Sequence, residues 1–291
     1  MNNPIDVVIP YVDSSDKVWQ KAYIDFCKFN NLQFKVADMQ TERYRDNLVL
    51  INYQLKLINK FMPWIRTIHL LLMNREQAPK DLPSNVNIVY HAQFIPKRYL
   101  PTFNSTTIEM FLWNIPNLSE KFIYANDDML PLRPLTQEHF FDGDKVRIEW
   151  WEEDIRELNT VFRLQSYNSY RHTLLRLGKG STKEQHFYLR PAHSFTPMIK
   201  SHCEQAYKLL HDLIEKHIRA FRTQYQYNQY IYPCFELLKY GTSENKIDFL
   251  YTQLKDNFDM RHDIVCFNII PPKKAKELKE RLEKLLWVTK L

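Results

Sequence analysis

The chain has 291 residues, of which 44% are hydrophobic and 25% charged, and its formal net charge is +6. This length suits one large domain or a core domain with an attached subdomain. The small positive excess fits an anionic substrate or a membrane surface and gives no reason to expect a nucleic acid partner. No stretch is apolar enough to span a bilayer and the N-terminus lacks signal-peptide features, so we expect a cytoplasmic protein.

Cysteine and glycine usage argues against several kinds of site. The four cysteines lie far apart with no C-x-x-C pair, which predicts reduced thiols and neither a zinc site nor a disulfide framework. Glycine occurs four times, at positions 143, 178, 180 and 241, and forms neither a G-x-G-x-x-G nor a Walker A motif. We therefore expect any phosphate group to be held by side chains, a metal ion or helix N-termini.

Strands and helices alternate in the first half of the chain. In order, the predicted elements are a strand over 5–11, a helix capped by Ser14-Ser15-Asp16 and ending near 30, a helix capped by Asp46-Asn47 and ended by Pro63, strands over 67–73 and 87–91, a helix opened by Asn104-Ser105, and a strand over 122–126. This order predicts an α/β fold with a mostly parallel sheet flanked by helices.

The pattern loosens beyond about residue 140. We expect helices over 196–219 and 224–240, and a separate basic amphipathic helix after Pro271-Pro272. Residues 1–140 are thus predicted to form the α/β core, 141–270 the remainder of the catalytic part with helical elements, and 271–291 the C-terminal helix. That helix has two interpretations: it docks on the protein, or its lysine and arginine face lies on a membrane over residues 273–291.

The stretch Ala125-Asn126-Asp127-Asp128 places two adjacent carboxylates directly after an apolar strand. Ligands of open α/β sheets bind beyond the carboxyl ends of the strands, and Asp13 follows the first strand in the same way. Paired carboxylates suit a hard divalent cation that neutralises a diphosphate. The alternative is a turn or helix cap, in which Asp and Asn are common.

Three neighbouring strings carry a more specific signal. They are IDVVIPYVDSSD, RYRDNLVLINYQLKLINKFMPWIRTIHLLLMN and LPTFNSTTIEMFLWNIPNLSEKFIYANDDMLPLRPL. In this order and spacing they resemble the Stealth family of sugar-1-phosphate transferases. Its first conserved region corresponds to residues 5–16, the second to about 43–134, the third to 190–200 with Phe221-Arg222, and the fourth, more faintly, to 263–270.

The resemblance implies a GT-A-like core and a defined reaction. A nucleotide sugar, most often a UDP-hexose or UDP-N-acetylhexosamine, donates sugar 1-phosphate to a hydroxyl group of a glycan acceptor, which is lipid-linked in one version of the hypothesis. UMP leaves, Mg²⁺ or Mn²⁺ assists, and the product belongs to a capsular or cell-wall polysaccharide. Two rivals stay open: a metal-dependent glycosyltransferase that releases UDP, and an inactive carbohydrate-binding or scaffold protein.

The resemblance also implies roles for residues in the later regions. His193 would be the general base that takes the proton of the acceptor hydroxyl, with Asp127 as a candidate to share that duty. Arg222 would stabilise charge on the transferring phosphoryl group, against the alternative of a surface helix charge. Asp127 and Asp128 would bind metal or acceptor, and Asn268 is a weaker metal candidate because Ile269, instead of Asp, follows it.

The remaining candidates are expected to bind the nucleotide or its phosphates. They are Asp13, Arg43, Arg45, Asp46, Asn47, Asn104 and Ser105. For most of them a local role competes: Asp13, Asp46, Asn47, Asn104 and Ser105 all lie where residues cap helices. The first region departs from the family in having Tyr11 and Ser14 where Trp and Gly are usual, so the packing of the nucleobase is expected to differ.

Overall fold

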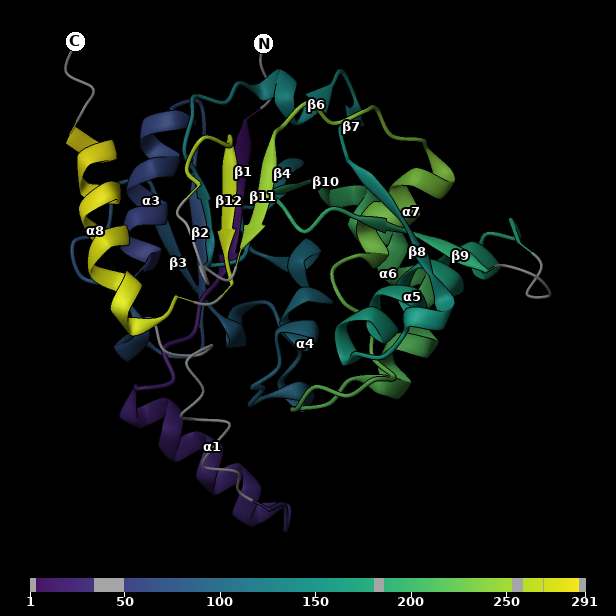
Figure 1. The fold of residues 1–291 in the computed structure, drawn as a ribbon. Coiled ribbons are helices and arrows are strands. Elements are labelled where there is room, and N and C mark those ends of the chain that lie inside the picture. Colours follow the sequence, from purple (N-terminus) through teal and green to yellow (C-terminus); the bar gives the residue numbers. More distant parts are fainter. Residues whose placement is uncertain (1–3, 34–49, 181–185, 253–258, 269, 288–291) are drawn as a thin grey trace.

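The computed structural model describes residues 4–33, 50–180, 186–252, 259–268 and 270–287. Its main sheet has five strands in the order β10-β4-β1-β2-β3 (Figure 1). They are β1 (Ile5–Pro10), β2 (Ile68–Leu72), β3 (Val86–Tyr90), β4 (Lys121–Tyr124) and β10 (Thr196–Ile199). The first four run parallel and β10 pairs antiparallel to β4.

Helices bury both faces of this sheet, which explains why β1 and β2 are apolar almost throughout. Val7 and Ile9 point to the face covered by α3 (Leu50–Phe61), where Leu55 packs against them. Val8 points to the opposite face, where it shares a core with Leu210 of α6 (Lys200–His217). The alternation along β1 therefore fixes which helix covers which face.

A second sheet of three strands, in the order β11-β12-β5, lies beside the first. Its members are β5 (Met129–Pro131), β11 (Phe249–Thr252) and β12 (Ile264–Phe267). The Phe267 N–H donates to the carbonyl of Asp128 at 2.8 Å. Segments more than 130 residues apart are thus joined at the acidic pair.

The remaining elements are α1 (Lys17–Phe29), α4 (Ser105–Glu109), the short hairpin β6 (Phe141–Asp142) and β7 (Lys145–Val146), the pair β8 (Trp150–Asp154) and β9 (Phe187–Pro191), α5 (Val161–Arg176) and α7 (Ile231–Lys239). Among them, β8, β9, α5 and α7 lie on the side of the main sheet away from α8, and α1 extends below α3 (Figure 1). Because β10 joins β4 in the main sheet, residues 1–140 and 141–270 contribute to one sheet.

The C-terminal helix α8 (Pro272–Trp287) packs on α3, as Figure 1 shows. Leu278 and Leu282 are fully buried in a core that includes Leu57 and Phe61, and the Tyr53 hydroxyl donates to Glu283 at 3.2 Å. This supports the docked interpretation of the helix; membrane contact through 273–291 stays a prediction. Among the described residues, no helix has both the length and the hydropathy to cross a bilayer.

The structure confirms an α/β fold with a mostly parallel sheet, flanking helices and a helical C-terminal part. Two predicted boundaries are wrong. Residues 196–199 are strand β10 instead of the start of a helix, and Pro197, which has no N–H, is tolerated because β10 is an edge strand. Residues 224–230 are not helical; α7 begins at Ile231, because backbone groups of the preceding segment bond to side chains of α5 and α4.

Candidate active site

A cleft of about 1170 Å³ opens at the carboxyl ends of the parallel strands. Tyr11 follows β1, Met73 follows β2, His91 follows β3 and Asn126 follows β4, and all four line it. Side chains from α1, α4, α5 and β9 complete the walls. The cleft thus occupies the place where open α/β sheets bind ligands.

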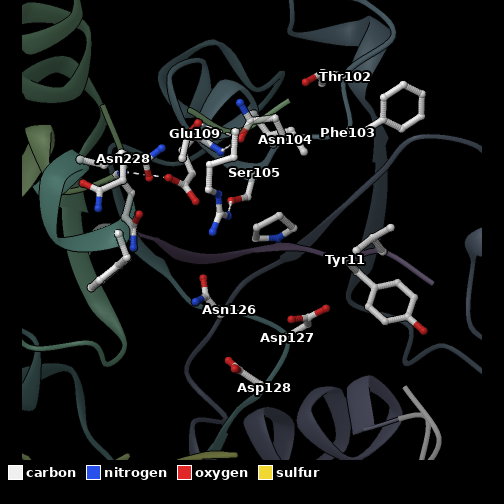
Figure 2. Close-up of a pocket in the computed structure, with 18 of the residues that line it drawn as sticks. Tyr11, Thr102, Phe103, Asn104, Ser105, Glu109, Asn126, Asp127, Asp128 and Asn228 are labelled. Atoms are coloured by element: carbon white, nitrogen blue, oxygen red, sulfur yellow. Dashed lines mark hydrogen bonds between the residues drawn. The ribbon is translucent and has the colours of Figure 1, made fainter. Parts of the chain in front are cut away.

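The acidic pair projects from the turn between β4 and β5. The Ala125 N–H still bonds to Val8 of β1, and the Met129 N–H then donates to the Asn126 carbonyl at 3.3 Å, which closes a tight turn. Asp127 and Asp128 therefore lie in the turn and outside the strand ladder. Both side chains are half-buried and line the cleft. In Figure 2 they lie on one side of the cavity, with Ser105 and Glu109 on the other. Asn268, at the end of β12, lines the same cleft.

His193 follows β9 and enters the cleft next to the turn that carries the acidic pair. Its Nε2 lies 3.1 Å from the Asn126 amide nitrogen, and its Nδ1 lies 3.2 Å from the Tyr230 hydroxyl. The rings of Phe162 and Tyr251 flank the imidazole at centroid distances of 5.7 and 6.0 Å. Contacts at both ring nitrogens hold the imidazole in one orientation, which a general base requires.

Arg222 reaches the cleft from the loop between α6 and α7. Its guanidinium donates to the Ser105 hydroxyl at the N-terminus of α4, and Ser105 in turn bonds to Glu109. The side chain is exposed, so the guanidinium remains available to a ligand while Ser105 fixes its position. The structure therefore brings two separate candidates from the sequence, Arg222 and Ser105, into contact in one cleft.

Glu109 was not anticipated from the sequence, yet it is a buried acid at the cleft wall. Its two carboxylate oxygens accept from the Tyr124 hydroxyl at 3.2 Å and from the Gln229 N–H at 2.8 Å. Burial raises the pKa of Glu109, while Arg222 and these hydrogen bonds oppose that rise. One sequence signal could have revealed it: Glu109 is the single charged residue in the otherwise uncharged run 99–118.

Arg190 is a second residue that the sequence reasoning missed, although it opens the third conserved region. Its guanidinium donates to the Glu153 carboxylate at 2.6 Å and lies 4.7 Å from the ring centroid of Trp151. The negative charge of Glu153 compensates the positive charge of this partly buried guanidinium. Burial raises the pKa of Tyr230, and Arg190 opposes that rise, so the guanidinium also lies close to the hydroxyl that contacts His193. Arg190 thus supports the His193 side of the cleft.

Asn104 and Asp13 are placed differently from the residues above. Asn104 is the N-cap of α4: its Oδ1 accepts from the Thr106 N–H at 3.2 Å, and the side chain is 2% exposed although it lines the cleft. Asp13 is not among the lining residues, and its carboxylate accepts from the Ser15 N–H at 2.8 Å. The cap of α1 is Asp16. Both observations match the local roles that competed with nucleotide binding.

Four further candidates lie outside the described residues. They are Arg43, Arg45, Asp46 and Asn47. Their expected roles in phosphate binding and helix capping stay predictions.

Comparison with known proteins identifies relatives of this chain. Residues 43–148 match the family model for conserved region 2 of Stealth proteins. A capsular polysaccharide phosphotransferase of Actinobacillus suis is 32% identical over 297 residues, covering 96% of this chain and 73% of the relative. This chain belongs to the Stealth family. A second relative, capsular polysaccharide phosphotransferase LcbA of Neisseria meningitidis, is 40% identical over 146 residues, covering 49% of this chain and 39% of its own length.

Membership of the Stealth family confirms the prediction of a phosphotransferase. The second conserved region begins where the strings placed it, at residue 43, and extends past the predicted end to residue 148. Among solved structures, the galactosyltransferase LgtC in complex with donor and acceptor sugar analogues matches with a TM-score of 0.40 and 12% identity, over 97% of this chain and 95% of LgtC.

Proposed function

We propose that this chain transfers sugar 1-phosphate from a nucleotide sugar to a hydroxyl group of a glycan acceptor in capsular or cell-wall polysaccharide synthesis. One observation supports the proposal above all: Asp127 and Asp128, His193 and Arg222 come from three distant parts of the chain and line one cleft. Cation ligands, a base for the attacking hydroxyl and a cation facing the transferred group are the parts that phosphoryl transfer needs.

The proposed donor is a UDP-hexose or UDP-N-acetylhexosamine. The acceptor oxygen forms a bond to the β-phosphorus, and the anhydride bond between the β-phosphorus and the bridging oxygen breaks. UMP leaves with that oxygen and its electron pair, and a phosphodiester joins the two sugars. Attack at the anomeric carbon would instead release UDP, so the nucleotide product distinguishes the two reactions.

His193 is the proposed acceptor of the hydroxyl proton. The Asn126 amide nitrogen is the neighbour of Nε2, so this ring nitrogen is oriented as an acceptor when the Nδ1 proton is directed to Tyr230. A hydroxyl that displaces the Asn126 contact would transfer its proton to Nε2 as the oxygen attacks phosphorus. Phe162 and Tyr251 beside the imidazole offer apolar ring surface to the acceptor sugar.

Arg222 is the proposed partner of the negative charge on the phosphoryl group. Its contact with Ser105 sets the direction of the guanidinium, and the buried Glu109 carboxylate lies behind Ser105. A guanidinium held in place before the reaction stabilises charge as it develops without having to reorganise. Because Arg222 is exposed to the cleft, a phosphate can displace water around it.

A divalent cation fits the chemistry of the other side of the cleft. Asp127 and Asp128 supply carboxylate oxygens and Asn268 an amide oxygen, which are hard donors of the kind Mg²⁺ and Mn²⁺ prefer. Among the described residues, no group of three His, Cys, Asp or Glu could enclose a metal ion. We therefore propose that the donor phosphates and water complete the coordination. A bound cation would neutralise the diphosphate and the departing UMP.

The product assay tests the proposal directly. The chain is incubated with a panel of UDP-sugars, Mg²⁺ or Mn²⁺ and an acceptor glycan, and the released nucleotide is identified. Acceptor-dependent UMP is expected, and chelation of the metal should abolish it. Release of UDP would assign a glycosyltransferase instead, and absence of any turnover with an intact, sugar-binding protein would assign a binding function.

We place the enzyme in the cytoplasm, where its donor would be available, and treat a lipid-linked acceptor as part of the proposal. All four cysteines are free and buried, in agreement with a reducing compartment.

A further inference from the structure

The loop that carries Arg222 lies between α6 and α7 and contains neither helix nor strand over residues 218–230. We call residues 219–224 the arginine loop. A loop without backbone ladder bonds has to satisfy its N–H and C=O groups in another way if it is to hold one conformation. Here buried side-chain amides do so on both sides of Arg222.

Gln226 is the centre of this arrangement, with its side chain 3% exposed. Its Oε1 accepts from the Thr223 N–H at 2.8 Å, and its Nε2 donates to the Phe221 carbonyl at 3.4 Å. A backbone N–H is always a donor and a carbonyl always an acceptor, so these two contacts fix which end of the amide is oxygen. Gln226 therefore ties together the residues immediately before and after Arg222.

Asn104 makes the second tie, from the N-terminus of α4. Its Oδ1 caps the helix through Thr106, and its Nδ2 donates both to the Arg219 carbonyl and to Gln226 Oε1, each at 3.1 Å. The same carbonyl of Arg219 also accepts from the Thr107 hydroxyl at 2.8 Å. The arginine loop and the start of α4 are thus joined by buried hydrogen bonds, at the point where Arg222 reaches Ser105 (Figure 2 shows Asn104 and Ser105 side by side).

Two more contacts close the arginine loop from its other side. Gln165 of α5 donates to the Thr223 carbonyl at 2.7 Å. The ring of Phe221 stacks on Phe103 with centroids 5.6 Å apart and planes 17° apart, and the Phe103 N–H donates to the Ala220 carbonyl at 3.0 Å. Every one of these partners lies outside the arginine loop, so the loop takes its shape from its surroundings.

We propose that Gln226 and Asn104 are positioning residues that act on the reaction through Arg222. This role needs no contact with a reacting atom: Gln226 fixes the backbone of Phe221 and Thr223, Asn104 fixes that of Arg219, and together they set the direction in which the guanidinium enters the cleft. This inference rests on the proposed role of Arg222 in phosphoryl transfer. Since a displacement of about 1 Å in a reacting group can cost roughly a hundredfold in rate, small shifts of the loop matter to catalysis.

The test is a double-mutant cycle on the full chain. Gln226→Met keeps the length of the side chain and removes its hydrogen bonds, and we expect kcat to fall about ten- to hundredfold while the dissociation constant of the donor changes little. In the Arg222→Ala background the same substitution should change kcat by less than about threefold, because the group through which it acts is gone. Independent, multiplicative losses in the two backgrounds would overturn the proposal.

A second variant removes the hydrogen bonds that Asn104 donates to the Arg219 carbonyl and to Gln226. Asn104→Asp retains the oxygen that caps α4 and removes the amide donor to Arg219 and Gln226, so α4 keeps its cap. It should show the same loss of kcat and the same dependence on Arg222. Thr173→Val is the matched control: the Thr173 hydroxyl is buried in the same helix α5 and donates to the Ser169 carbonyl of that helix, so its loss should leave kcat unchanged.

Amide hydrogen exchange separates this inference from the proposed reaction. The Thr223 N–H should be protected in the wild type and exchange faster in Gln226→Met, at an unchanged rate in Thr173→Val. The double-mutant cycle can be measured by following release of either nucleotide, UMP or UDP. Release of UDP would refute the proposed transfer of sugar 1-phosphate, but it would not contradict the positioning role of Gln226 and Asn104. An unprotected Thr223 N–H in the wild type would refute the positioning role by itself.

Discussion

Replacement of Glu109 by glutamine should separate activity from stability. Glutamine has nearly the same shape as glutamate, and its amide oxygen can still accept from the Gln229 N–H. The Tyr124 hydroxyl, which donates to Glu109 in the wild type, can rotate and accept a hydrogen bond from the new amide NH₂ group. What is lost is the negative charge behind Ser105 and Arg222. A hydrogen bond to a charged group contributes about 1.5 to 3 kcal/mol, and each 1.36 kcal/mol is about tenfold in rate. We therefore expect kcat to fall roughly ten- to hundredfold.

Stability should move in the opposite direction. Burial raises the pKa of Glu109 above its usual value of 4.5, so the native state holds the proton more tightly than the unfolded chain does. The stabilisation linked to this proton is complete below pH 4.5 and is lost as the pH rises through the native pKa. Because glutamine needs no proton to be neutral, Glu109→Gln should gain free energy of unfolding relative to the wild type at pH 7, and the gain should shrink as the pH approaches 4.

Two measurements on the same preparations check this reasoning. Steady-state nucleotide release gives kcat, and urea unfolding at pH 7 and pH 4 gives the free energy of unfolding. Glu109→Asp is the control, since it keeps the charge on a shorter side chain. An active Glu109→Gln enzyme would refute the role of the charge, and a variant less stable than the wild type at pH 7 would refute the account of its burial.

Four further predictions concern other parts of the molecule. Asp128→Ala and His193→Ala should each lower kcat by about a hundredfold or more, measured by nucleotide release; a near-normal rate would remove that residue from the proposed mechanism. Asp6→Asn should reduce stability at neutral pH, because hydrogen bonds from His69 and Arg66 overcome burial and lower the pKa of Asp6 well below its usual value of 3.8. The wild-type advantage should therefore be present above pH 3.8 and disappear as the pH falls through the native pKa, as followed by unfolding curves. Leu282→Ala should cost about 2 to 5 kcal/mol in unfolding free energy because the side chain is fully buried, whereas a loss below 0.5 kcal/mol would contradict firm docking of α8. Deletion from Lys273 should weaken sedimentation with anionic liposomes if this segment also contacts membranes, and unchanged binding would leave docking as its role.

Local patterns in the sequence predicted the elements that form the site better than they predicted their boundaries. The strands ending before Asp13 and Asp127 and the helix capped at Asp16 were read from β-branched runs and cap residues, and the structure has them as β1, β4 and α1. The start of α6 was misjudged because the pairing of Thr196 with Tyr124 is a tertiary contact that no local pattern records. The start of α7 was misjudged for the same reason. The helix was predicted from residue 224 but begins at Ile231, because backbone groups before it bond to distant side chains such as Glu109.

The sequence by itself determined the order of strands and helices up to β4, the acidic pair at the end of a strand and, through its motifs, the Stealth family. These features depend on neighbouring residues, since periodicity and capping act over a few positions. Only the tertiary structure decided that His193 and Arg222 meet the acidic pair in one cleft, that the Gln229 N–H donates to the buried Glu109 carboxylate, and that Asn104 ties the arginine loop to the start of α4. Such contacts join segments tens to more than a hundred residues apart, and they form only when the packing of the whole sheet and its helices brings those segments together.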